Sequence, residues 1–412
     1  METVSTKDRE RLRALAELKL SFAHSKKNEE ILKQWEALGN GIKARPTVRL
    51  MYVNYLNEVV EPRLVCEGQD ARELESDLLY SLVGPELFDD DTPVSPYFDI
   101  NLKAYAYPFG TNANITYSKT SKGYHINPIT DDIEADIDLF RGGKFSTSME
   151  NTVKYRDWVN EIIGDILPAK IIGRGLTGAI TNPLVCLLGL ENYYLSMYDA
   201  PEALHEIMEM ATQLYLDYYD HLEKNNLLLP TNEFSVVSQE SFCFTNELPK
   251  DGPITSTKQV WGFLESQETT AVSPEAYGEF VYPYLDRLVK RFGLLSYGCC
   301  ERVDNLWEDY LSKWTNLRKL SVSPFNDRNK VGEYLRGTNV VYYCKPRADY
   351  ITSKSGLDEE AVSKYFKELA LTANGCLLEV AQREVVTIYG DIERGRRYVQ
   401  LAKQAIDTYW QP

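Results

Sequence analysis

A pair of thiols beside a carboxylate is the feature of this sequence best suited to chemistry. Cys299, Cys300 and Glu301 directly follow the short apolar run 293–298, which is typical of a buried strand. Thiolates bind soft or borderline metals, and a carboxylate adds a harder ligand. Because side chains alternate along a strand, Cys299 and Glu301 share a face if the strand continues through them. The cluster therefore indicates either a metal or catalytic site or two thiols buried as small hydrophobes.

Several other apolar runs also end in a side chain that can bind or react. These runs begin near 260, 317, 339 and 376, and the side chains in or just beyond them are Glu265, Glu268, Ser323, Lys345, Cys376 and Glu379. The carboxyl ends of the parallel strands in a (β/α)8 barrel open onto one face, so we expect these groups to converge there. The simpler alternative is an ordinary ion pair between Glu268 and Lys345.

The spacing of the runs predicts the elements that position these residues. Apolar runs alternating with helical patterns indicate βα units, and eight strand candidates favour a (β/α)8 TIM barrel, of class α/β, over an open doubly wound sheet. The candidates lie near 48, 171, 227, 260, 293, 317, 339 and 376. Helical periodicity predicts two amphipathic helices over 6–24 and 28–38. We therefore expect an N-terminal helical extension (1–45) and a single barrel domain (46–412) with an irregular insert at about 84–150.

Composition narrows the possible partners. The 412 residues carry 45 Lys and Arg against 61 Asp and Glu, a net charge of −16, and no basic stripe, which argues against nucleic acid. No window of about 18 apolar residues and no signal peptide are present, so we expect no membrane association. The seven cysteines are irregularly spaced, as in a reduced, cytoplasmic protein. No P-loop, GxGxxG, HExxH or CxxC motif occurs.

Taken together, several segments resemble the uroporphyrinogen decarboxylase superfamily, and more narrowly its decarboxylase-like branch near the corrinoid-dependent methyltransferases. The matching stretches are 261–268, 272–275, 292–301, 317–324 and 345–346, within a likeness that covers about 170–410. The resemblance implies a (β/α)8 barrel with its site in the C-terminal cleft, and a homodimer. The arginine-rich signature of true uroporphyrinogen decarboxylases is missing, since only Arg45 and Arg49 lie between 45 and 55. Porphyrinogen decarboxylation is therefore not expected.

The methyltransferases of this superfamily bind zinc through a His-x-Cys pair and a cysteine of the last strand. In this chain Tyr297 takes the place of the histidine, and Cys299 matches the cysteine. Cys300 or Glu301 could replace the lost ligand, and Cys376 or Glu379 could supply the third. The predicted metal ligands are Cys299, Cys300, Glu301 and Glu379.

The resemblance implies a methyltransferase or demethylase that moves an O- or N-methyl group from a small compound to a corrinoid on a partner protein, with zinc as the Lewis acid. The alternative is a metal-free lyase for a small carboxylic acid, in which Glu268 delivers a proton and Lys345 stabilises negative charge. A barrel that only binds is a third hypothesis. The residues expected to contact substrate are Glu265, Gln267, Tyr297 and Ser323. Aromatic residues of the insert, such as Phe98 and Tyr105, either wall a pocket for a planar ligand or simply pack.

Overall fold

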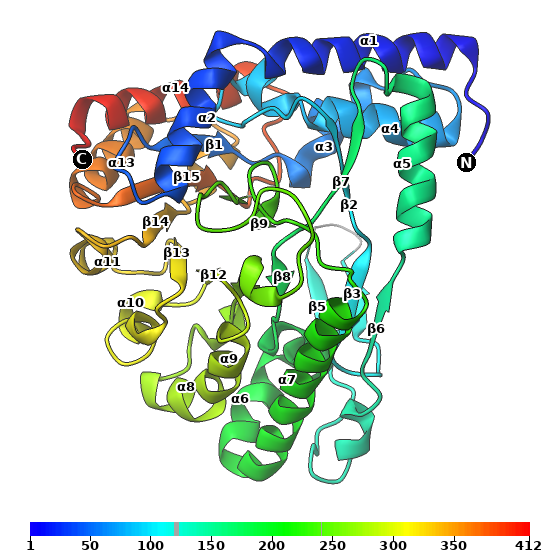
Figure 1. Cartoon of the computed structure of the whole chain (residues 1–412). Coiled ribbons are helices and arrows are strands. Elements are labelled where there is room, and N and C mark those ends of the chain that lie inside the picture. The colour runs from blue at the N-terminus through cyan, green and yellow to red at the C-terminus, as the bar shows by residue number, and fades with distance from the viewer. Residues whose placement is uncertain (119–122, 240) are drawn as a thin grey trace.

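A seven-stranded parallel sheet forms the centre of the computed structural model, which describes residues 1–118, 123–239 and 241–412 (Figure 1). Residues 119–122 of the predicted insert lie outside the described residues. The sheet order is β1-β15-β14-β13-β12-β11-β8, so the strands predicted near 260, 293, 317, 339 and 376 are neighbours in sequence order, as expected. Its strands are β1 (Thr47–Leu50), β8 (Leu176–Thr177), β11 (Trp261–Leu264), β12 (Leu294–Tyr297), β13 (Leu317–Val322), β14 (Val341–Cys344) and β15 (Leu377–Gln382).

Helices cover the outer face of this sheet, so every residue of the strands β12 to β15 is buried. Outward residues such as Leu295, Leu320 and Leu378 pack with the helices in one large core. Figure 1 shows α10, α11 and α13 on this side of the molecule. The helices of the C-terminal two thirds are α6 (Thr181–Asp199), α7 (Pro201–Lys224), α8 (Pro274–Phe280), α9 (Tyr282–Val289), α10 (Val303–Leu306), α11 (Arg328–Leu335), α12 (Asp349–Thr352), α13 (Glu359–Thr372) and α14 (Ile392–Tyr409).

The two predicted N-terminal helices are confirmed as α1 (Thr6–Ala23) and α2 (Lys26–Gly39). Each begins at a serine whose hydroxyl accepts a hydrogen bond from a backbone N–H of the first turn, which is the ordinary N-cap. Trp35 of α2 packs with Val341 and Leu377, the first residues of β14 and β15. Helix α2 therefore closes the amino end of the sheet's inner face.

A hairpin of β9 (Val236–Ser238) and β10 (Ser241–Phe242) packs against the rest of this inner face. Val237 contacts the cluster around Trp261, and Phe242 contacts Trp35. The hydroxyl of Ser241 meets a buried ion pair between Lys319 and Glu379. The hairpin thus fills the space that a closed barrel would enclose.

Among the described residues, the strands do not close into a hydrogen-bonded ring, so the eight-stranded barrel is confirmed only as a barrel-like α/β fold. The strand expected near 171 is β7 (Ala169–Ile172), but it pairs with β2 (Phe98–Asn101) outside the main sheet. The strand expected near 227 is wrong: residues 227–230 form no strand, and Pro230 has no N–H to donate.

A close backbone contact joins the chain that leads into the edge strand β8 to the β9–β10 hairpin. Gly175 donates its N–H to Val236 (3.1 Å), and any Cβ at this position would lie 2.4 Å from the Val237 carbonyl oxygen. Only glycine permits this approach, which brings the hairpin against the chain leading into β8.

The predicted insert at 84–150 contains a short helical segment, η3 (Val83–Phe88), β2 and two antiparallel pairs. These pairs are β3 (Ala104–Tyr107) with β6 (Lys144–Thr147), and β4 (Asn114–Tyr117) with β5 (Tyr124–Asn127). They lie on the side of the molecule away from α10–α13 (Figure 1). The remaining N-terminal helices are α3 (Leu56–Val59), α4 (Gln69–Tyr80) and α5 (Met149–Ile163). In the described parts of the chain, every helix is too short or too polar to span a bilayer.

Candidate active site at the carboxyl ends of the strands

Loops from neighbouring strands bring ionisable side chains together at the carboxyl end of the sheet. Glu265 directly follows β11, Lys345 follows β14 and Arg383 follows β15. The segment Cys299–Glu301 comes just after β12, where Gly298 turns the chain with φ +100°, a conformation that favours glycine. The convergence expected from the sequence is therefore present for Glu265, Lys345 and the segment Cys299–Glu301.

Glu265 is a carboxyl group held in an unfavourable place for a negative charge. Only 5 % of the residue is exposed, and burial, helped by the nearby carboxylates of Glu268 and Glu301, raises its pKa well above the ordinary 4.5. One oxygen accepts the backbone N–H of Gln267 at 2.9 Å, which offsets only part of this effect. Burial of Glu265 beside these groups therefore favours its protonated, neutral form.

The two neighbouring glutamates are held by donors on both oxygens. Glu268 accepts hydrogen bonds from Thr181 (2.7 Å) and Asn182 (2.8 Å). Glu301 accepts the backbone N–H groups of Ser266 (2.8 Å) and Cys299 (2.6 Å), which ties the loops after β11 and β12 together. Burial nevertheless raises the pKa of Glu301. Glu268 does not pair with Lys345 in the described structure, so the simple ion pair between them is not formed.

The adjacent thiols form a hydrogen-bonded pair at the partly exposed edge of the cluster. The sulfurs of Cys299 and Cys300 are 3.8 Å apart. Their hydrogen bond lowers the pKa of Cys300 and raises that of Cys299, and the nearby Lys345 ammonium favours both thiolates. Cys300 is therefore the better nucleophile of the two.

Lys345 lies beside the thiols, and Arg383 lies near Lys345. Lys345 is 5 % exposed, and burial, with a smaller effect of Arg383, lowers its pKa to about 8. Its ammonium group donates to the side-chain oxygen of Gln239 and to the Cys299 carbonyl (3.3 Å). Arg383 has two buried nitrogens, Nε and Nη1, with no hydrogen-bond partner among the described residues, and only a 3.5 Å contact from Nη2 to Glu384. Such unsatisfied donors are suited to an anion.

Three of the four residues predicted to contact substrate make hydrogen bonds that support the site instead. Tyr297 is fully buried, and its hydroxyl meets Ser266 (2.7 Å) and Tyr277 (2.9 Å) on the helical side. The Ser323 hydroxyl donates to the Cys300 carbonyl (3.1 Å), and the backbone of Gln267 supports Glu265. Glu265, the fourth, lies within the cluster.

The predicted metal ligands are not assembled into one site. Glu379 lies within β15, where it accepts from Lys319 (3.0 Å) and Ser241 (2.9 Å). Cys376, the other candidate, precedes β15 and donates to the Gly332 carbonyl, at the opposite end of the strand from the thiols. Both oxygens of Glu301 already accept backbone N–H groups. Within the described ranges no group of three His, Cys, Asp or Glu side chains is placed to hold a metal, so the residues do not fit a zinc ion.

Sequence reasoning missed Arg383 and Gln239. Arg383 follows the last strand as Lys345 follows the one before it, so position alone could have indicated it. Gln239 could not have been found, because it reaches Lys345 only through the turn of the β9–β10 hairpin, where it adopts φ +48°.

Comparisons with known proteins support the architecture alone. No protein-family model matches the chain, and no curated protein matches it. Similar solved structures include a methyltransferase from Methanosarcina mazei, with 12% sequence identity and a TM-score of 0.51, over 91% of this chain and 98% of that one. At this identity the likeness shows a shared fold.

Proposed function

We propose that this chain is a methyl-transferring enzyme in which Glu265 acts as the acid at the carboxyl end of the sheet. The observation that carries the proposal is the burial of Glu265 beside two other carboxyl groups, which raises its pKa and favours the protonated form that an acid needs. Methyl transfer is proposed as the reaction class because a solved structure with a similar fold is a methyltransferase.

The chemistry follows from charge. A methyl group leaves an oxygen or nitrogen more readily when the departing atom does not acquire negative charge, and a zinc ion or a proton can each prevent this. Since the ligand set does not fit zinc, the proton is the better match to these residues. The bond between methyl and heteroatom breaks with its electron pair on the heteroatom, which takes the Glu265 proton, while the methyl group passes to the acceptor. Solvent then restores the proton.

For the acceptor we propose a reduced corrinoid on a partner protein, in keeping with the sequence resemblance. The partly exposed thiols mark where the site opens, so the partner would approach over the loops after β12 and β14. Lys345 and Arg383 would hold an acidic group of the methyl donor, which explains the unpaired nitrogens of Arg383.

A metal-free lyase for a small carboxylic acid is the second candidate. The same unpaired nitrogens of Arg383, next to Lys345, favour it, because a substrate carboxylate would satisfy them. Glu265 is better placed than Glu268 to deliver the proton, since both Glu268 oxygens already accept hydrogen bonds.

The test uses chelator-treated protein, small O- and N-methyl acids as donors and a reduced corrinoid as acceptor. We expect transfer to persist without metal, and Glu265→Gln to reduce turnover by about 10²- to 10⁴-fold, the usual contribution of a general acid. Glu150→Gln, an exposed glutamate on α5, is the matched control. Full activity in Glu265→Gln, or loss of activity on metal removal, contradicts the proposal. Release of carbon dioxide without methyl transfer selects the lyase.

A further inference from the structure

A crevice of about 1460 Å³ lies away from the carboxyl ends of the strands, on the side where the sheet does not close. It is lined by the β2–β7 ladder, by β3, by α4 and by the outer side of the β9–β10 hairpin. It exceeds the roughly 300–1,000 Å³ of a typical small-molecule site. None of Glu265, Lys345 and Arg383 lines it, so a ligand bound there is independent of the proposed function.

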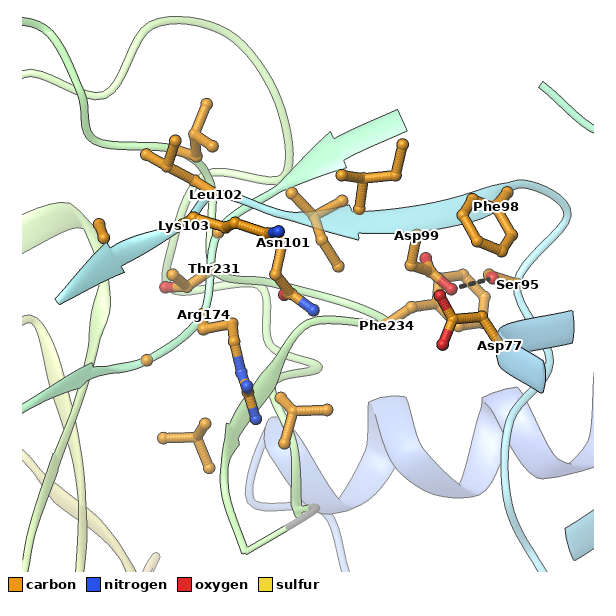
Figure 2. A pocket seen from close by; sticks show the side chains of 18 of the residues that line it. Asp77, Ser95, Phe98, Asp99, Asn101, Leu102, Lys103, Arg174, Thr231 and Phe234 are labelled. Atoms are coloured by element: carbon orange, nitrogen blue, oxygen red, sulfur yellow. Dashed lines mark hydrogen bonds between the residues drawn. The ribbon is translucent and has the colours of Figure 1, made fainter. Parts of the chain in front are cut away.

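One end of the crevice carries hydrogen-bond donors. Arg174 follows β7, is exposed, and has no hydrogen bond or ion pair with any residue that the structure describes. Asn101, the last residue of the neighbouring strand β2, and Lys103, two residues further on, line the same end (Figure 2). The Thr231 hydroxyl oxygen already accepts the Trp261 N–H (2.7 Å), so its own proton remains available. This group is suited to a carboxylate, which a guanidinium binds through two parallel hydrogen bonds.

The other end carries acceptors. Figure 2 shows Asp77, Asp99 and Ser95 together, apart from Arg174 and Asn101. Asp99 accepts from Ser95 (2.8 Å) and from the buried Lys19 (3.4 Å) through one oxygen, and its other oxygen, Oδ1, is buried without a partner in the described chain. Asp77 opens into the crevice, although the protein around it, with Glu73, raises its pKa to about 6. Asp77, Asp99 and the nearby Glu73 outnumber the one Lys19 ammonium in contact with Asp99, so this group of side chains is net negative.

The strand itself sets the distance between the two ends. Asp99 and Asn101 are two residues apart on β2, so their side chains leave the same face about 7 Å apart along the strand. Phe98 and Phe234 line the same crevice and offer apolar surface. The net charge of −16 disfavours the binding of a ligand that carries only negative charge. It does not disfavour a ligand that carries one charge of each sign.

We propose that this crevice binds an elongated organic zwitterion, with its carboxylate at Arg174 and Asn101 and its ammonium group at Asp77 and Asp99. The apolar spacer of the ligand lies along β2. The crevice acts as a binding site, and no reaction takes place there.

Calorimetric titration with 6-aminohexanoate, hexanoate, hexylamine and 3-aminopropanoate tests the proposal. We expect 6-aminohexanoate to bind at least tenfold more tightly than each of the other three, because only it satisfies both ends at once. Arg174→Gln should weaken 6-aminohexanoate at least tenfold, since a hydrogen bond to a charged group contributes enough for such a factor. Asp77→Asn should weaken 6-aminohexanoate and leave hexanoate unchanged.

Arg141→Gln is the matched control, because Arg141 is an exposed arginine outside the crevice that pairs with Asp138 and Glu206. Circular dichroism and the melting temperature of each variant establish that it is folded. Absence of saturable binding by 6-aminohexanoate overturns the proposal. Equal binding of hexanoate, or an unchanged Kd in folded Arg174→Gln, overturns it equally.

Discussion

The chemistry proposed for this protein depends on differences in the hydrogen bonds that three neighbouring glutamates accept. Glu268 and Glu301 each receive donors on both oxygens, whereas Glu265 receives a single backbone N–H. Because like charges in a buried site oppose one another, the carboxyl with the fewest donors, Glu265, is the one whose protonated form is most favoured. Differences of this kind between paired carboxyl groups separate acids from bases in many enzymes.

The raised pKa of Glu265 should affect stability as well as activity. A carboxyl that binds its proton more tightly in the folded state stabilises the fold at low pH, and this contribution is lost as pH rises from the unfolded value, about 4.5, through the folded one. We therefore expect Glu265→Gln to flatten the fall in the free energy of unfolding above pH 5. Urea titrations at several pH values measure this. Parallel curves for wild type and Glu265→Gln would show that Glu265 is not protonated.

The two adjacent thiols should differ in reactivity. Cys300 has a lowered pKa and lies near Lys345, while Cys66, Cys243, Cys344 and Cys376 are buried with raised pKa values. We expect iodoacetamide at pH 7 to modify Cys300 first, and Lys345→Met to slow this reaction by removing the cation. Peptide mass spectrometry identifies the site. First labelling at Cys299, or an unchanged rate in Lys345→Met, contradicts the assignment.

At the scale of elements, the β9–β10 hairpin and the sheet are joined by a buried charge network. Lys319 of β13 contacts Glu379 of β15 (3.0 Å) and donates to Ser241 of β10 and to the Phe242 carbonyl (2.7 Å). Lys319 also lies between the rings of Trp35 and Trp261. The network therefore fixes the hairpin whose turn reaches Lys345 in the candidate active site.

Removing one partner of this network should be costly. Lys319→Met leaves Glu379 buried without its counter-charge, which typically costs about 3–5 kcal/mol. Lys154→Met, in an exposed pair with Glu150, should cost less than about 1 kcal/mol. Denaturant unfolding of both variants gives the comparison. The double variant Lys319→Met, Glu379→Leu should recover part of the loss, and equal costs for Lys319→Met and Lys154→Met would show that the network does not stabilise the fold.

At the scale of the whole molecule, the sequence was informative where chemistry follows position along a strand. Continuous apolar runs predicted the neighbouring strands from β11 to β15, and strand ends predicted where Glu265, the thiols and Lys345 converge. Closure of the barrel was not predictable in this way. Pro230 and the glycines at 173 and 175 replace regular strands with single contacts, and the hairpin occupies the interior instead.

The predicted metal ligands are not brought together, for a similar reason. The predicted ligands lie on the expected strands, but the position of a residue along its strand decides which groups it contacts. Glu379 sits within β15 beside Lys319, and Cys376 precedes the strand, so neither reaches the carboxyl end where the thiols lie. Residue types alone do not predict that position along the strand.

The protonation state of Glu265 decides whether this residue can act as the acid. A difference infrared spectrum between wild type and Glu265→Gln at pH 7 isolates this one carboxyl group. We expect the carbonyl band of a protonated acid, which disappears only when the pH is raised well above the ordinary range for glutamate. The bands of an ionised carboxylate at pH 7 would contradict it.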